Sequence, residues 1–114
     1  MASTRIAKVN AFLKTEVSQL LEKFVQNEKT GLLTVIRVDT ASDLSESRIW
    51  ISVMGGQVSE LTCLKKIKQK SNLLQNSIRQ KMSAHRVPRL KFLIDKNAEY
   101  VENIEKILRE IHNN

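Results

Sequence analysis

The chain has 114 residues, a length that suits one compact domain and is too short for two. Hydrophobic residues make up 41% of it, and three glycines and one proline leave little room for linkers, which favours a globular protein over a disordered one. The net charge is +7, and no apolar run approaches the ~20 residues that a membrane-spanning helix needs. We therefore expect residues 1–114 to form a single domain without a membrane segment.

The first predicted element is an amphipathic helix over Thr4–Val25, in which apolar residues recur at steps of three and four. The residues before it lack the apolar run of a signal peptide. The single cysteine, Cys63, occupies a position in a later helical pattern, where we predict a small core thiol. A lone thiol suits a reducing compartment, so we expect a cytoplasmic protein.

Two strands are predicted after this helix. Gly31 precedes a run rich in β-branched residues, Leu32–Val38, and a polar loop over 39–47 leads to Arg48–Met54. A loop of this length between neighbouring strands favours an antiparallel hairpin. Trp50 falls opposite the apolar face of the second strand, where packing at the sheet edge or against another element is favoured over stacking on a nucleobase. The apolar face consists of Ile49, Ile51 and Val53.

A long helical region is predicted from Glu60 to Met82, with Ser59 as its N-cap. Ser71-Asn72 interrupts the apolar stripe of this region near its middle. Both residue types compete with the helix for backbone hydrogen bonds, and Asn72 can adopt the left-handed geometry that glycine otherwise supplies. We therefore expect a kink or short turn there that divides the region into two helices.

The last two predicted elements are a strand and a helix. Val87-Pro88 must leave the helical conformation, because the residue before proline is pushed towards extended geometry. Leu90–Ile94 then forms the third strand, and a final helix starts at Asp95 or Asn97. The order α-β-β-α-kink-α-β plus a C-terminal helix predicts an α+β fold, with a three-stranded sheet covered on one face by helices.

This order of elements is that of the prokaryotic, type II, K-homology arrangement. K-homology modules bind single-stranded RNA with a Gly-x-x-Gly loop between paired helices. The glycines of this chain, Gly31, Gly55 and Gly56, all lie elsewhere. We therefore predict a K-homology-like fold that does not hold RNA with the usual loop.

Positive charge is concentrated in one region of the chain. Between Leu61 and Ile94 there are nine basic residues and no acidic residue, whereas the remainder carries ten basic and twelve acidic residues. A regional field of one sign favours a polyanionic partner, and the alternative is a solvated surface, which ordinarily mixes both signs. The nine are Lys65, Lys66, Lys68, Lys70, Arg79, Lys81, Arg86, Arg89 and Lys91.

The sequence lacks the residue patterns of common enzyme sites. It contains no glycine-rich phosphate loop, no cluster with metal-ligand spacing and no His-Cys pair at useful spacing. Asp39, Asp43 and Glu46 are better interpreted as turn-forming residues than as a carboxylate site. We expect no catalysis, no cofactor, no metal and no small-molecule substrate, and nothing in the sequence indicates an assembly beyond the monomer.

Four collinear stretches, spanning residues 5–95, carry a family resemblance. Three of them are Arg5-Ile6-Ala7-Lys8, then Gly31-Leu32-Leu33-Thr34-Val35 with Val38, and then Ser42-Asp43-Leu44 with Ile49-Trp50-Ile51-Ser52-Val53. The most specific is Arg86-Val87-Pro88-x-Leu90-x-Phe92-x-x-Asp95, which is close to a Val-Pro-x-Leu-x-Phe-x-x-Asp pattern. In these stretches the chain resembles the bacterial ribosome-binding factor A family.

This resemblance implies a K-homology-like fold in which an interhelical kink replaces the Gly-x-x-Gly loop. Where the family usually has an Ala-Ser-Gly-like kink, this chain has Lys70-Ser71-Asn72. The resemblance further implies a protein that binds the free small ribosomal subunit, assists late maturation and processing of its RNA, leaves before translation, and matters especially in the cold. A general single-stranded RNA binder of K-homology type and a protein-interaction adaptor remain the alternatives.

Candidate RNA contacts are the basic residues around the kink and the proline turn, together with the polar residues of the kink itself. Cations neutralise phosphates, and this gives a salt-dependent affinity. The selected residues are Lys65, Lys66, Lys70, Ser71, Asn72, Arg79, Lys81, Arg86, Arg89 and Lys91.

Overall fold

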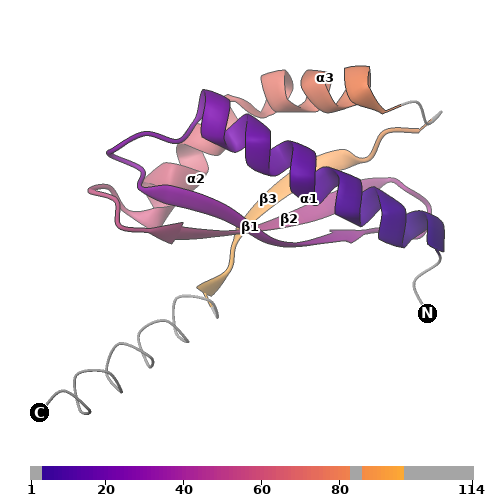
Figure 1. Ribbon diagram of the computed structural model, residues 1–114, viewed down its shortest axis with the longest axis horizontal. Coiled ribbons are helices and arrows are strands. Elements are labelled where there is room, and N and C mark those ends of the chain that lie inside the picture. Colours follow the sequence, from indigo (N-terminus) through magenta and orange to yellow (C-terminus); the bar gives the residue numbers. More distant parts are fainter. Residues whose placement is uncertain (1–3, 83–85, 97–114) are drawn as a thin grey trace, which may run out of the picture.

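Helix α1, Thr4–Phe24, is amphipathic as predicted and ends one residue earlier than expected. In the computed structural model the described residues are 4–82 and 86–96 (Figure 1). One face of α1 is buried and packs chiefly on the first strand. The buried side chains are Ile6, Leu13, Val17, Leu20 and Leu21.

Strands β1, Leu32–Thr40, and β2, Glu46–Met54, form the predicted antiparallel hairpin. Both strands extend further into the connecting segment than expected, because its polar residues find partners. Thr40 pairs with Ser47 across the ladder, their hydroxyl oxygens lie 2.7 Å apart, and the Thr40 hydroxyl also donates to Asn10 Oδ1 at 2.6 Å. The register shift between Val35 and Arg37, a β-bulge, was not predicted from the residue pattern.

The long helical region is divided into α2, Glu60–Gln69, and α3, Ser71–Lys81. Ser59 caps α2 as predicted, since its hydroxyl oxygen accepts a hydrogen bond from the Thr62 amide at 3.1 Å. The predicted place of the break was wrong by one residue. Lys70, at φ −96° and ψ 6°, is the non-helical residue, and Ser71 and Asn72 begin α3. Asn72 is not left-handed, because a bridge-region residue suffices to redirect the chain.

Strand β3, Arg89–Ile94, lies beside β2 and runs parallel to it, which gives the sheet the order β1-β2-β3. A parallel neighbour requires a crossover connection, and the two helices α2 and α3 provide it. Trp50 therefore lies on the central strand, so of the two predicted placements, at the sheet edge or against another element, the sheet edge was wrong. The expected final helix lies outside the described residues, apart from its proposed start at Asp95.

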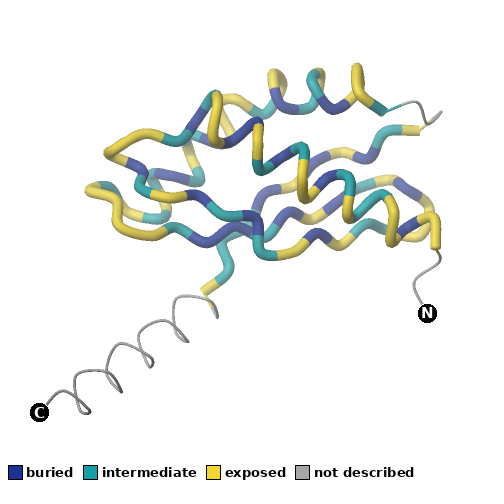
Figure 2. Tube along the Cα trace, in the orientation of Figure 1, coloured by how far each residue is buried: buried dark blue, intermediate teal, exposed yellow. Residues whose placement is uncertain are grey.

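The helices cover one face of the sheet, as predicted, and the core lies between these two layers (Figures 1 and 2). Ile49 and Ile51 point into it from β2, and Leu90 and Phe92 from β3. Cys63 is fully buried there, as expected, and burial raises the pKa of its thiol. In the described part of the chain, no helix has the length and apolar character to cross a membrane. The structure thus has the K-homology-like α+β architecture.

Two turns meet at the end of the hairpin that adjoins α2. The Lys29 carbonyl oxygen accepts hydrogen bonds from the amides of Gln57 and Val58, at 2.8 and 3.1 Å. A Cβ atom on Gly31 would overlap the backbone of Met54 and Gly56. Only glycine therefore allows this close approach.

Gly31→Ala tests this contact against a control with the same backbone geometry. Gly31 and Gly55 have φ of +74° and +73°, but a Cβ on Gly55 meets open space. Gly55→Ala should therefore lower the free energy of unfolding by about 1–2 kcal/mol, the left-handed penalty alone. Gly31→Ala should add about 1–3 kcal/mol for the overlap, measured by urea unfolding. Equal losses in the two variants would contradict the close-approach argument.

Candidate nucleic-acid interface

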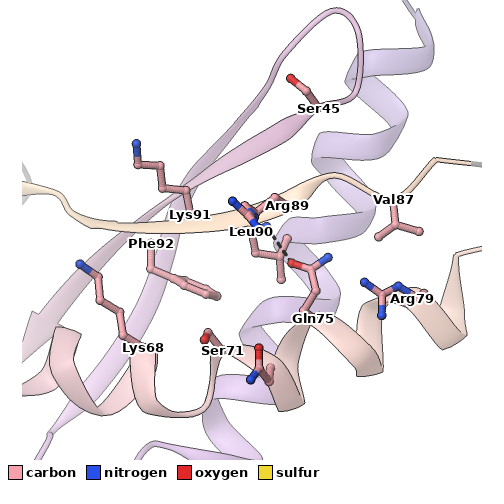
Figure 3. Close-up of a pocket in the computed structure, with 11 residues that line it drawn as sticks. Ser45, Lys68, Ser71, Gln75, Arg79, Val87, Arg89, Leu90, Lys91 and Phe92 are labelled. Atoms are coloured by element: carbon pink, nitrogen blue, oxygen red, sulfur yellow. Dashed lines mark hydrogen bonds between the residues drawn. The ribbon is translucent and has the colours of Figure 1, made fainter.

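A groove of about 740 Å³ lies between α3 and β3 and extends to the end of α2 (Figure 3). Its floor is apolar, and its rims carry positive charge. Lys68 and Arg79 come from the helical side, and Arg89 and Lys91 from β3. No carboxylate stands among the described residues that line it. The remaining lining residues are Ser45, Ser71, Asn72, Gln75, Val87, Leu90 and Phe92.

The alternation of β3 separates the floor of the groove from its charged rim. Leu90 and Phe92 are 8% and 4% exposed and point towards the helices, whereas Arg89 and Lys91 are exposed. Successive strand residues face opposite sides, so a basic-apolar-basic-apolar sequence produces this separation directly. The cations thus stay hydrated at the rim while the floor belongs to the core.

The side chain of Gln75 joins the two walls of the groove. Its Nε2 donates to the Pro88 carbonyl oxygen at 2.8 Å. Its Oε1 accepts from the Leu90 amide at 2.9 Å (Figure 3). These two backbone groups lie on the edge of β3 that faces away from β2, since the Arg89 amide donates to Ser45 on the other side. One amide side chain therefore satisfies the start of an otherwise open strand edge and sets the spacing of α3 from β3.

The loop at residues 41–45 closes one end of the groove. The Ser45 amide donates to Asp43 Oδ1 at 3.0 Å. Hydrogen bonding from Ser45, from its side chain first and then its backbone, holds the pKa of Asp43 below its ordinary value. Leu44 adopts a φ of +62° and is buried, so the turn is fixed by an apolar anchor as well as by Asp43. Asp43 therefore serves the loop geometry that the sequence suggested.

The groove gathers five of the ten predicted contact residues: Ser71, Asn72, Arg79, Arg89 and Lys91. The other five lie elsewhere for identifiable reasons. Lys81 Nζ is paired with Glu16 Oε2 at 2.8 Å, and Arg86 Nη1 donates to the Asp43 carbonyl oxygen at 3.1 Å. Lys65 lines a separate, smaller hollow beside Leu61 on α2, Lys66 is half-buried, and Lys70 is exposed at the helix break.

Besides the apolar floor, three polar lining residues were not among the predicted contacts: Lys68, Gln75 and Ser45. The position of Gln75 in the groove could have been predicted from its spacing. Ser71, Gln75 and Arg79 follow one another at four-residue intervals and therefore share a helix face. Lys68 precedes Ser71 by three residues, although the break intervenes. Ser45 had no local signal, since the pairing of β3 with β2 brings it there.

The chemistry that this groove can perform is binding. The described residues contain no group of three or more histidine, cysteine or carboxylate side chains that could hold a metal ion. Four cations around an apolar floor attract a polyanion, and the polar side chains of the kink can donate to phosphate or base edges.

Fold and groove together define a K-homology-like protein whose helix break replaces the clamping loop. The model of the family described as "Ribosome-binding factor A" matches residues 5–108, and the chain belongs to this family. A relative of that name from Brevibacillus brevis is 29% identical over 111 residues, which are 97% of this chain and 92% of the relative.

Solved structures agree on the fold. The crystal structure of ribosome-binding factor A from Thermus thermophilus has a TM-score of 0.68 and 22% identity, covering 78% of this chain and 94% of that one. A homology model of the Thermus thermophilus factor, fitted into a cryo-EM map of a 30S–RbfA complex, has a TM-score of 0.63 and 23% identity. That likeness covers 74% of this chain and 88% of the other.

Gln75→Ala should loosen the groove, because it removes both hydrogen bonds between α3 and β3. We expect the free energy of unfolding to fall by about 1–3 kcal/mol and the Leu90 amide to exchange faster. Gln75→Glu keeps the acceptor for the Leu90 amide and should protect that amide better than alanine does. Hydrogen exchange measures both effects. Gln80→Ala, on the exposed end of the same helix, is the control, and an equal effect there would refute the bridging role.

Proposed function

We propose that this protein is a ribosome assembly factor that binds the free small ribosomal subunit and assists late maturation and processing of its RNA. The observation that carries the proposal is the groove, whose described lining residues include four cations and no carboxylate around the α3–β3 junction. Membership of the ribosome-binding factor A family supports it, as does the complex with 30S described for the Thermus thermophilus relative.

Binding energy alone drives this action in our proposal. A protein that prefers one conformation of an RNA shifts the folding equilibrium of that RNA towards it by the difference in affinity. The protein acts as a cytoplasmic monomer with one K-homology-like domain, uses no cofactor and catalyses no reaction. A contribution in the cold follows from the same principle, because misfolded RNA states persist longer when thermal energy is low.

A second candidate is a general binder of single-stranded RNA, which the K-homology-like fold favours. Such a protein would bind short oligonucleotides as well as it binds the subunit. The two candidates therefore differ in the preference for the folded particle. A protein-interaction adaptor, the remaining alternative, would form complexes that survive ribonuclease.

The first test is co-sedimentation with purified free small subunits and, separately, with assembled ribosomes across a salt titration. We expect binding to the free subunit alone. The affinity should fall with salt with a log–log slope of about −3, if the four groove cations each contact a phosphate. Equal binding to both particles, or binding to neither, would overturn the proposal.

Charge reversal identifies the surface that is used. Arg79→Glu places a carboxylate on the rim of the groove and should weaken subunit binding about tenfold or more and flatten the salt dependence by about one to two units of slope. Lys8→Glu makes the same charge change on α1, which lines no part of the groove, and serves as the matched control. If both variants lose the same affinity, only the net charge of the protein matters and the groove assignment is wrong.

A further inference from the structure

The face of the sheet turned away from the helices carries an aromatic ring among cations. Among the described elements, no helix lies on this face (Figure 1). Trp50, on the central strand, is its large aromatic residue. In the register of the strands Arg37 stands beside Trp50 on β1, and Leu93 stands beside it on β3. Three residues that pair in register thus form one row across the open face.

The guanidinium of Arg37 lies over the Trp50 ring, with its carbon 4.5 Å from the ring centroid. The β-bulge between Val35 and Arg37 causes this contact. Without the extra residue, strand alternation would turn Arg37 towards the core, whereas the observed register buries Val35 and Val38 and leaves Arg37 outside. The Arg37 side chain is still 58% exposed, so it remains accessible from solvent while it lies over the ring.

Stability alone does not account for the indole at this place. Trp50 Nε1 is buried and has no hydrogen-bond partner among the described residues, which is unfavourable for the folded chain. The cation–π contact with Arg37 and packing hold the ring instead.

The next row of the same face places like charges side by side. Arg48 on β2 pairs in register with Asp39 on β1 and with Lys91 on β3, and all three are exposed. Like charges directly opposite one another destabilise a sheet unless an anion lies between or above them. Glu46 is 3.5 Å from Arg48 and Asp39 stands opposite it, so these exposed carboxylates compensate Arg48, whereas Lys91 forms no ion pair within the described residues. Asp39, 3.5 Å from Arg37, is the other carboxylate near these rows.

We propose that this open sheet face binds single-stranded RNA as a second contact surface, with a nucleobase stacked on the Arg37 guanidinium above Trp50 and a phosphate held by Arg48 and Lys91. Unpaired bases stack on arginine planes and aromatic rings, and the adjacent cations supply the charge complementarity for the backbone. The inference rests on the proposed RNA-binding function and adds a surface that the groove does not include.

The two surfaces meet at β3. Arg89 and Lys91 belong to β3, the edge strand of the sheet. They line the groove where β3 adjoins α3, and they also border the open face of the sheet. An RNA strand that leaves the groove across β3 therefore reaches the row of Arg48 and Lys91 first and the stack of Arg37 and Trp50 next. A duplex presents no free base faces, so the open face selects unpaired segments.

The intrinsic fluorescence of Trp50 tests the proposal directly, because it is the single tryptophan of the chain. The purified protein is titrated with an unstructured oligoribonucleotide of about ten nucleotides, a length in the range that single-strand sites cover. A ribose-phosphate oligomer of equal length without bases is the control. Anisotropy of a dye on each oligomer reports binding independently. We expect the RNA to quench Trp50 at saturation and the abasic oligomer to bind without quenching.

Arg37→Lys keeps the charge and removes the plane on which a base stacks. This variant should lose most of the base-dependent quenching and bind the oligoribonucleotide about tenfold more weakly, with abasic binding unchanged. Arg79→Glu, in the groove, should weaken binding of both oligomers and retain the quenching at saturation.

Each contrary result has a distinct meaning. Bound RNA without quenching, equal quenching by both oligomers, or quenching that Arg37→Lys leaves intact would overturn the open-face surface while subunit co-sedimentation stands. Base-dependent quenching in a protein that fails to co-sediment with free subunits would instead overturn the proposed function and leave this surface in place.

Discussion

The parallel pairing of β3 with β2 is the contact on which both candidate surfaces depend. The strand that follows the helices reaches the hairpin only because α2 and α3 cross the core between them. On its inner edge β3 bonds to β2, and on its outer edge Gln75 satisfies the Pro88 carbonyl and the Leu90 amide. Loss of these hydrogen bonds on the two edges of β3 would separate the walls of the groove. It would also remove Lys91 from its place beside Arg48.

The break at Lys70 determines where α3 can lie. A single bridge-region residue turns the chain between two helices without a glycine loop, so no glycine-rich backbone is available to clamp a nucleic-acid strand. Binding then depends on side chains. Ser71, at the start of α3, faces the same groove as Arg79 two turns later, and the rigid helix holds them in a fixed relation. This arrangement favours recognition of shape and charge over a flexible grip.

The charge of the chain is separated in space as well as in sequence. The basic region supplies α2, α3 and β3, whereas α1 and the hairpin carry carboxylates. Glu16 of α1 neutralises Lys81 at the end of α3, and the groove rim stays free of such partners among the described residues. A positive electrostatic potential therefore extends along β3. Ordinary solvated surfaces do not produce this, because they intersperse both signs.

The sequence by itself determined the elements, since each depends on local periodicity: the helical stripe of α1, the alternation that buries Ile49, the Ser59 cap and the basic-apolar alternation of β3. Its regional charge and its motifs also indicated the family. The tertiary structure alone decided which cations share a surface. Helical spacing spreads charges over a wide arc, and only the packing of α3 beside β3 separates Arg79 from the paired Lys81. The bulge that lays Arg37 over Trp50 is a property of strand register, which involves residues distant in the chain and has no local signature.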